Sequence, residues 1–286
     1  MTLIEWPACQ NYTTRDDILK ILLTNDDGIH APGLWAAAEA LSGLGDLYIV
    51  APDREQSGVG ASLTLHHPLL VHTISVDRYV KDRTIVNNMT AFSVEGTPAD
   101  SAILALEELV GPVDLVVSGI NSGSNLGWDV IVSGTVGAAF QGYMRGYPTI
   151  AISVGSIQNP IFTVPARLLK IISEYIKHNT IEQCFLNVNV PSVKTNDLKG
   201  VEITRLGGRS YGESVRKDTS GIHEKYWISR NRPIHNDNGN GTDMFAMKNN
   251  IASITPIALN FTNSSEISSL ELLLSELSDH LFGIAN

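Results

Sequence analysis

Cysteine is scarce in this sequence, because the 286 residues include only two, Cys9 and Cys184. So few cysteines exclude a disulfide-dense scaffold and a cysteine-rich zinc site. No apolar run approaches the roughly 20 residues of a membrane span, and no basic stretch followed by an apolar leader opens the chain. We therefore expect a cytoplasmic protein without a membrane partner, in which Cys184 is a small buried hydrophobe.

Dense runs of lysine and arginine are also lacking, and the chain carries a formal net charge of -10 at pH 7. Binding along a nucleic-acid backbone needs clustered basic side chains, so we expect no nucleic-acid polymer as a partner. An acidic protein that handles phosphate esters needs a cation or oriented backbone dipoles to offset its own charge. With 43% hydrophobic and 17% charged residues, the composition suits a globular protein with a sizeable core.

Short apolar runs alternate with amphipathic segments along much of the chain, which predicts strands and helices in turn. We expect strands at residues 19–24, 46–52, 113–119, 148–154 and 184–191, and helices at residues 32–45, 97–111, 134–146 and 164–178. This alternation predicts an α/β fold with a Rossmann-like, mostly parallel sheet and helices on both faces. Two further extended segments, 63–76 and 84–96, favour an antiparallel pair at one edge of the sheet.

The sequence divides into three parts around this alternating core. Residues 1–18 are polar and aperiodic, and we interpret them as an N-terminal extension to a Rossmann-like catalytic core at 19–190. Residues 191–286 form a C-terminal segment, in which alternation around a glycine- and serine-rich turn predicts a protruding hairpin within 201–230. The same segment contains a short predicted strand, residues 253–259, and a terminal amphipathic helix, residues 264–283. A protruding arm often pairs with another subunit, so we expect this segment to serve oligomerisation.

Two adjacent carboxylates, Asp26 and Asp27, follow the first predicted strand directly. A single aspartate is common there as a turn or cap residue, whereas two neighbours repel each other. In a doubly wound sheet, ligands bind at the carboxyl ends of the strands, where we also expect Ser57 and Asn121. Hard divalent cations prefer carboxylate, amide and hydroxyl oxygens, so these four residues predict a Mg²⁺ or Mn²⁺ site.

The segment SGTVGAA, residues 133–139, is a second candidate binding element. Ser133, Gly134 and Thr135 stand at a loop-to-helix junction, where free N–H groups and two hydroxyls suit an anion. The alternative is an ordinary N-cap, although the glycines that precede the segment favour a ligand loop. The sequence has neither a GxGxxG fingerprint nor the GKS or GKT of a P-loop here, which disfavours a dinucleotide oxidoreductase and a P-loop nucleotidase.

Two other polar residues near the predicted strand ends carry weaker signals. His30 follows the acidic loop closely and is a candidate for the lining of the site. Arg54 is expected either to hold a substrate phosphate or to pair with its neighbour Asp53. Thr242 and Asp243 either lie close to the site or only cap the start of a helix.

Several longer motifs together resemble one known family. They are ILLTNDDGIHAPG, VAPDREQSGVGASLT, VEGTPADS, DLVVSGINSGSNLGWDV, SGTVGAA, NVNVP, YWI and GTD, which run from about Lys20 to about Leu259. In order and spacing they look like the motifs of the survival protein E (SurE) family of nucleoside-monophosphate phosphatases. The resemblance implies a Rossmann-like core, a divalent metal, and hydrolysis of 5′- or 3′-nucleotides or, in some members, short polyphosphate. It also implies a homodimer or homotetramer built through the C-terminal part.

The resemblance also assigns expected roles to individual residues. The family's metal ligands fall on Asp26, Asp27, Ser57 and Asn121, and its phosphate-binding loop falls on Ser133, Gly134 and Thr135, with Asn125 nearby as a further substrate contact. The expected activity is therefore a metal-dependent phosphomonoesterase with nucleoside monophosphate substrates, in which the metal activates water. We expect one of the two aspartates to act as general base.

Two readings without catalysis stay open at this point. A nucleotide-binding module would keep the anion loop but would not need two carboxylates facing a cation. A structural interaction protein would use the hairpin arm as its functional part and would show no phosphatase activity.

Overall fold

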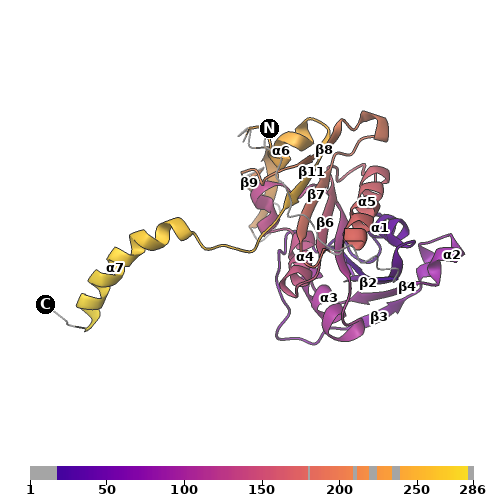
Figure 1. Cartoon of the computed structure of the whole chain (residues 1–286), viewed down its shortest axis with the longest axis horizontal. Helices are drawn as coiled ribbons and strands as arrows, with labels where there is room; N and C mark the ends of the chain where they lie inside the picture. The colour runs from indigo at the N-terminus through magenta and orange to yellow at the C-terminus, as the bar shows by residue number, and fades with distance from the viewer. Residues whose placement is uncertain (1–17, 180, 209–210, 219–223, 234–238, 283–286) are drawn as a thin grey trace.

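The computed structural model describes residues 18–179, 181–208, 211–218, 224–233 and 239–282. Most of these residues build an α/β body, and the C-terminal helix stands away from it (Figure 1). Within these residues, none of the helices combines the length and the apolar character needed to cross a membrane. The N-terminal extension predicted for residues 1–18 lies outside the described residues, apart from Ile18.

In the described part of the chain, nine strands form one sheet in the order β3-β4-β2-β1-β5-β6-β7-β11-β8. The strands are β1 (Leu19–Thr24), β2 (Gly45–Pro52), β3 (Val71–Ile74), β4 (Met89–Val94), β5 (Leu115–Ser122), β6 (Thr149–Val154), β7 (Phe185–Val190), β8 (Gly200–Ile203) and β11 (Ile251–Pro256). The run β4-β2-β1-β5-β6-β7 is parallel and has the 3-2-1-4-5-6 order of a doubly wound fold. The predicted Rossmann-like, mostly parallel sheet is therefore confirmed.

Helices cover both faces of this sheet, as the sequence predicts. The helices of the described residues are α1 (Pro32–Leu41), α2 (Arg83–Val86), α3 (Pro98–Leu104), α4 (Gly134–Met144), α5 (Thr163–Asn179), α6 (Asp243–Lys248) and α7 (Ser264–Phe282), of which α7 stands away from the sheet. Helices α1 and α5 pack on one face, while α3 and α4 pack on the other (Figure 1). The core follows this layering, because Ile21 and Leu23 belong to the cluster on the α1 side, whereas Leu22 and Val116 face the α3 side. Cys184 is half-buried against the core and carries a free thiol, so it is less buried than predicted.

The start of α3 and the end of α1 show how local sequence shapes these helices. Thr97 caps α3 in a reciprocal capping box with Asp100, which confirms the predicted N-cap. Helix α1 ends at Leu41, although the sequence predicts a helix to residue 45. Gly45 instead opens β2, where a Cβ atom would lie only 1.8 Å from the carbonyl oxygen of Leu19 in β1. Close pairing with β1 requires glycine at this position and draws it into the sheet.

The extended segments at the sheet edges follow the sequence only in part. Strand β3 pairs antiparallel with β4 at the edge of the sheet, as predicted. The hairpin predicted within 201–230 starts later, because β8 belongs to the main sheet and only β9 (Tyr211–Asp218) and β10 (Lys225–Pro233) pair as a separate hairpin. Alternation identifies a strand but not its partner, which explains the error. Strand β11 joins the main sheet beside β7, and the division of the chain at residue 190 stays a prediction.

Candidate active site

The carboxyl ends of β1 and β5 meet where the order of the parallel strands reverses. In doubly wound folds, the ligand crevice forms at this switch point. Asp26 and Asp27 follow the end of β1, and Asn121 lies at the end of β5. The predicted carboxylate pair and the predicted amide donor therefore come from adjacent strands at the edge where a ligand is expected.

Asp26 is the most enclosed of the predicted metal ligands, with 4% of its surface exposed. Thr135 Oγ1 donates a hydrogen bond of 2.6 Å to Asp26 Oδ1. The start of α4 also approaches closely, because a Cβ atom on Gly134 would lie 2.8 Å from Asp26 Cβ. Burial raises the pKa of the Asp26 carboxyl to about 6, the Thr135 hydrogen bond opposes this rise, and the charge of Asp27 adds to it.

Asp27 is half-buried and is tied to β5. Its Oδ2 accepts a hydrogen bond of 2.9 Å from the backbone N–H of Ser122. Burial raises the pKa of the Asp27 carboxyl, hydrogen bonds from Ser122 lower it, and the negative charge of Glu55 raises it further. Both aspartates therefore bind protons more tightly than they would in water. A divalent cation beside them would take over the role of those protons.

The two predicted neutral oxygen donors differ in their settings. Asn121 is buried, and its Nδ2 donates a hydrogen bond of 2.6 Å to the carbonyl oxygen two residues later, which leaves Oδ1 as an acceptor. Ser57 is exposed, and its hydroxyl donates a hydrogen bond of 2.7 Å to Glu55 Oε1. The neighbouring backbone N–H of Gln56 donates a hydrogen bond of 2.8 Å to the Asp26 carbonyl oxygen. The loop that carries Ser57 is thereby fixed beside the carboxylate pair.

This donor chemistry fits a hard divalent cation such as Mg²⁺ or Mn²⁺. Among the described residues, no group of three or more histidine, cysteine, aspartate or glutamate side chains is arranged to hold a metal ion. A cation here would therefore depend on Asp26, Asp27, the amide and hydroxyl oxygens of Asn121 and Ser57, and water, a shell typical of Mg²⁺. Glu55 is the nearby charged group that the sequence analysis missed. Its position among polar residues just after a predicted strand was the available signal.

The predicted phosphate loop forms the start of α4. Ser133 is the N-cap, and its Oγ accepts a hydrogen bond of 3.2 Å from the backbone N–H of Val136. Its hydroxyl hydrogen stays available for an anion. The backbone N–H of Thr135 is hydrogen-bonded to Asp26, which leaves the N–H of Gly134 as the helix N–H that can face an anion. Thr135 is fully buried, and its hydroxyl hydrogen is donated to Asp26. In this arrangement Thr135 positions a carboxylate, and its predicted contact with phosphate would require the hydroxyl to turn.

Asn125 lies half-buried in a polar network beneath this loop. Its Nδ2 donates a hydrogen bond of 2.9 Å to Ser153 Oγ and lies 3.4 Å from Thr135 Oγ1. Asn187 and Asn189 both donate side-chain hydrogen bonds to its carbonyl oxygen, and Asn189 Oδ1 accepts its backbone N–H at 2.8 Å. The polar residues of β7 thus hold Asn125, and through Thr135 the network reaches the carboxylate pair.

Comparison with known proteins identifies the family of this chain. The family described as Survival protein SurE matches residues 21–213, which include every predicted site residue. The chain belongs to the SurE family. Relatives named 5′-nucleotidase SurE from Geobacter sulfurreducens and Legionella pneumophila are each 41% identical over 261 residues. These matches cover 88% and 91% of this chain and 93% and 98% of the two relatives. The family resemblance seen in the motifs is therefore confirmed.

A solved structure of the SurE family is similar throughout most of its length. The crystal structure of the SurE protein from Aquifex aeolicus matches this chain with a TM-score of 0.73 and 37% sequence identity. The match covers 89% of this chain and 99% of the Aquifex chain. The α/β fold of this chain is therefore that of a SurE protein.

A further buried aspartate, Asp243, fixes the loop before α4 in this SurE-family chain. Its carboxylate accepts backbone hydrogen bonds from Gly127 at 2.7 Å and from Gly207 at 2.8 Å. Burial raises the pKa of the Asp243 carboxyl, and these N–H groups oppose the rise. The N-cap of α6 is Thr242, so Asp243 does not serve as the cap. Asp243 joins the C-terminal segment to the loop that leads into α4, a role that no local pattern predicts.

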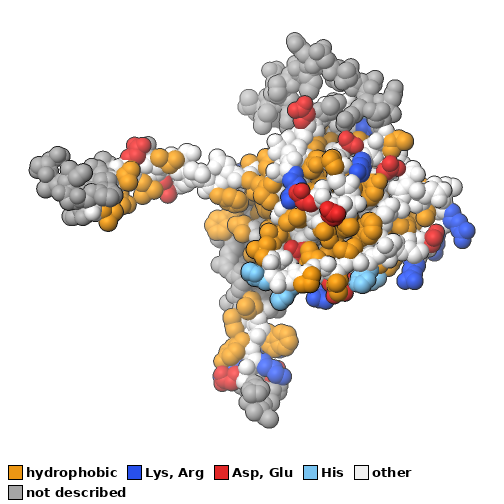
Figure 2. Space-filling model, turned by 90° about the horizontal axis from the view of Figure 1, so that it is seen from below, with side chains coloured by type: hydrophobic (Ala, Val, Ile, Leu, Met, Phe, Trp, Pro, Cys, Tyr) orange, Lys and Arg blue, Asp and Glu red, His pale blue; other side chains and the backbone are white. Residues whose placement is uncertain are grey.

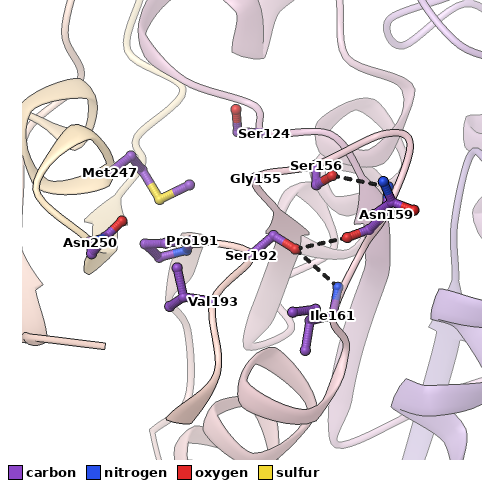
Figure 3. Close-up of a pocket in the computed structure, with 10 residues that line it drawn as sticks. All are labelled: Ser124, Gly155, Ser156, Asn159, Ile161, Pro191, Ser192, Val193, Met247 and Asn250. Carbon is purple, nitrogen blue, oxygen red and sulfur yellow. Dashed lines mark hydrogen bonds between the residues drawn. The ribbon is translucent and has the colours of Figure 1, made fainter. Parts of the chain in front are cut away.

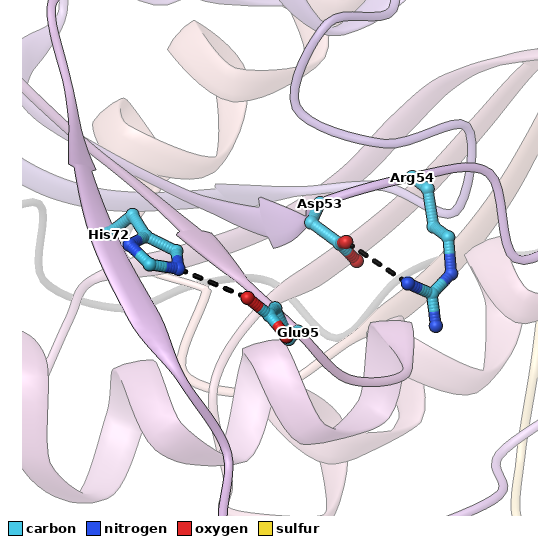
Figure 4. Close-up of polar contacts among 4 residues, drawn as sticks. All are labelled: Asp53, Arg54, His72 and Glu95. Carbon is cyan, nitrogen blue, oxygen red and sulfur yellow. Dashed lines mark hydrogen bonds and ion pairs between the residues drawn. The ribbon is translucent and has the colours of Figure 1, made fainter.

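Side chains from β3 and from the residues just after β2 and β4 form two pairs at this edge of the sheet (Figure 4). Arg54 contacts Asp53 at 3.2 Å, and His72 contacts Glu95 at 3.2 Å. Of its two predicted roles, Arg54 therefore takes the pairing with Asp53. Exposed pairs of this kind contribute little to stability. His30, a candidate for the site lining, contacts a tyrosine hydroxyl through its Nδ1.

Proposed function

We propose that this chain is a divalent-metal-dependent 5′-nucleotidase that hydrolyses nucleoside 5′-monophosphates to nucleoside and phosphate. The observation that carries the proposal is the pair of adjacent, desolvated carboxylates, Asp26 and Asp27, beside the N-terminus of α4. A negative pair there suits a cation, and a helix N-terminus suits phosphate. The SurE relatives named 5′-nucleotidase support the choice of substrate.

The proposal gives each predicted site residue a task. Asp26, Asp27, Ser57 and Asn121 would hold the cation, Mg²⁺ or Mn²⁺. When bound, the cation offsets the charge of the phosphate ester and lowers the pKa of a water molecule. The Ser133 hydroxyl and the backbone N–H of Gly134 bind the non-bridging phosphate oxygens. Thr135 and Asn125 keep Asp26 in place from behind.

Hydrolysis forms a bond between a water oxygen and phosphorus while the bond from phosphorus to the ester oxygen breaks. One of the two aspartates takes the proton that the water loses. The ester oxygen leaves with the nucleoside and takes a proton from solvent. We extend the proposal to nucleoside 3′-monophosphates, to short polyphosphate and to a cytoplasmic location.

Phosphate release from 5′-nucleotides, 3′-nucleotides and tripolyphosphate tests this proposal. We expect release to stop in EDTA and to return when Mg²⁺ or Mn²⁺ is added. The variant Asp27→Asn should lower turnover by about 10²-fold or more without changing the far-UV circular dichroism spectrum. The matched control is Asp77→Asn, which changes an exposed aspartate of the 3₁₀ helix Val76–Arg78 and should leave turnover unchanged. A protein that binds nucleotides but releases no phosphate with either metal would instead be a non-catalytic nucleotide-binding module.

We also propose that the chain forms a homodimer or homotetramer through α7. This helix projects from the body (Figure 1) and exposes an apolar stripe made of Ile267, Leu270, Leu273, Leu274, Leu277 and Leu281. Apolar side chains are also visible on the body beside it (Figure 2). An apolar groove of about 380 Å³ lies there, with Trp128, Ile131, Phe140 and Met144 in its lining. A stripe of this length is normally covered, and the groove of a second copy offers a matching surface.

Light scattering of purified protein tests the oligomer. The double variant Leu273→Glu/Leu277→Glu places charges in the stripe and should reduce the mass to that of a smaller species. The control variant Glu271→Gln changes an exposed polar side chain of the same helix and should keep the mass of the unmodified protein. If the double variant also kept that mass, the oligomer would not depend on α7.

A further inference from the structure

A cavity of about 580 Å³ opens at the carboxyl ends of β6 and β7, beside the candidate active site (Figure 3). Its ten lining residues come from the loops after β5, β6 and β7 and from the region of α6. None of the ten carries a charge. The volume lies within the range of about 300–1,000 Å³ that is typical of small-molecule sites.

The lining combines apolar surface with polar groups that are free to bind. Met247 and Pro191 present apolar surface to the cavity. Among the described residues, no hydrogen-bond partner is found for the side chains of Ser124, Asn159 and Asn250. Figure 3 shows Met247 and Asn250 across the cavity from Asn159. Apolar side chains interspersed with uncharged polar groups suit a small, uncharged organic molecule that carries hydrogen-bonding groups of its own.

The wall that carries Asn159 is fixed by the other polar residues of the cavity. Ser156 Oγ accepts a hydrogen bond of 3.2 Å from the backbone N–H of Asn159. Ser192 Oγ donates one of 3.1 Å to the Asn159 carbonyl oxygen and accepts one of 3.0 Å from the backbone N–H of Ile161 (Figure 3). The backbone of Asn159 is therefore held while its side-chain amide stays free, so a ligand would meet a preorganised group.

One loop joins this cavity to the carboxylate pair. The backbone N–H of Ser122 donates to Asp27 Oδ2 at 2.9 Å, and Ser124 lines the cavity. Between them, Gly123 packs tightly on the loop after β6, since a Cβ atom on it would lie 3.2 Å from Ile157 Cγ1. The carboxylate pair follows β1, so two or three strand spacings of about 4.8 Å each separate it from the tips of β6 and β7, a span that a nucleotide covers. A single small molecule can therefore reach both places.

We infer that this cavity binds the nucleoside part of a nucleotide whose phosphate lies at the carboxylate pair, an inference that rests on the proposed function. Ribose and nucleobase are uncharged, as is the lining. The edge of a nucleobase presents amide-like donors and acceptors, which complement the Asn159 and Asn250 amides. Its flat face fits against Met247, whose thioether packs well on aromatic rings. A second phosphate is disfavoured because no lysine or arginine lines the cavity.

Binding of free ribonucleosides tests the cavity without relying on catalysis. We expect at least one of the four ribonucleosides to bind the unmodified protein in EDTA, as measured by NMR titration. Asn159→Ala should weaken that binding about tenfold, since a hydrogen bond is lost. The matched control Asn88→Ala changes an exposed asparagine at the amino end of β4 and should bind as the unmodified protein does. Absence of binding by all four ribonucleosides, or undiminished binding by Asn159→Ala, would overturn the inference.

Hydrolysis of two esters distinguishes this inference from the proposed function. Asn159→Ala should lower kcat/KM for the preferred nucleoside 5′-monophosphate about tenfold and leave kcat/KM for p-nitrophenyl phosphate unchanged. An equal fall for both esters would contradict a nucleoside site. If the unmodified protein hydrolysed neither ester with Mg²⁺ or Mn²⁺, the proposed function would fail, while the ribonucleoside titration would still decide whether the cavity binds nucleosides.

Discussion

The face of the sheet that packs on α3 and α4 is apolar in one part and polar in the other, although both parts are equally buried. Leu22 in β1 and Val116 in β5 belong to the apolar cluster. Two residues further along these strands stand Thr24 and Ser118, and all four side chains are 0% exposed. The next position after Thr24 on this face belongs to the carboxylate pair. The buried side chains of this face therefore become polar toward the candidate site, although they do not become more exposed to solvent.

The two parts act differently on stability. The hydroxyls of Thr24 and Ser118 are buried without a hydrogen-bond partner among the described residues. A buried polar group left unsatisfied costs about 1–3 kcal/mol, whereas buried apolar surface stabilises the fold by about 25 cal/mol per Å². The apolar part of this face therefore offsets the cost of the polar part. We expect substitutions in the two parts to change the free energy of unfolding in opposite directions.

The largest effect is expected in the apolar part. Leu22→Ala should lower the free energy of unfolding by about 2–5 kcal/mol, because it removes buried methyl groups and leaves a cavity. Urea unfolding measures this loss, and metal-dependent phosphate release per folded molecule should not change. A loss below about 1 kcal/mol would contradict the view that this apolar cluster stabilises the sheet that carries the site.

The next effect belongs to Asp26 in the metal-free protein. Because the folded-state pKa rises from 3.8 to about 6, Asp26 favours folding at low pH, and this contribution is lost as the pH rises through 6. The loss corresponds to about 3 kcal/mol. Relative to Asp26→Asn, the unmodified protein in EDTA should therefore lose roughly 2 kcal/mol of stability between pH 4 and pH 7.5. If the free energy of unfolding changed with pH in the same way in both proteins, Asp26 would not be a carboxylate that is buried beside the negative charge of Asp27.

The smallest effect is expected at the unpartnered hydroxyl. Thr24→Val keeps the shape of the side chain and should raise the free energy of unfolding by up to about 1 kcal/mol. The matched control is Thr204→Val, since the Thr204 hydroxyl lies 2.7 Å from both Ser253 Oγ and Thr255 Oγ1. That variant should instead lower the free energy by about 1 kcal/mol. A similar loss in both variants would show that Thr24 has a partner such as a buried water.

Much of the fold was predictable because its signals are local. Apolar runs of strand length, the proline and threonine at the start of α3, and the alternation of strands with helices each depend on neighbouring residues. The end of α1 was not predictable in this way, since Gly45 belongs to β2 because of its close contact with Leu19 in β1. The extent of the hairpin was also missed, because an alternating pattern does not say whether β8 pairs with β11 or with β9.

The placement of several candidate site residues at the strand ends was predictable for the same reason. Asp26, Asp27 and Asn121 follow from the rule that ligands bind at the carboxyl ends of parallel strands. The hydrogen bond from Thr135 to Asp26 spans 109 residues, and that from Gly127 to Asp243 spans 116. The neighbouring cavity is lined by residues from separate loops. Contacts of this kind depend on the packed fold, and no spacing in the sequence predicts them.

Calorimetric titration of the metal-free protein with Mn²⁺ at pH 7.5 tests most directly whether Asp26 and Asp27 form a divalent-cation site. We expect one Mn²⁺ per chain in the unmodified protein and in the control Asp77→Asn. Asp26→Asn should weaken binding by about tenfold or more, and the double variant Asp26→Asn/Asp27→Asn should not bind. Equal Mn²⁺ binding by the unmodified protein and the double variant would contradict the account.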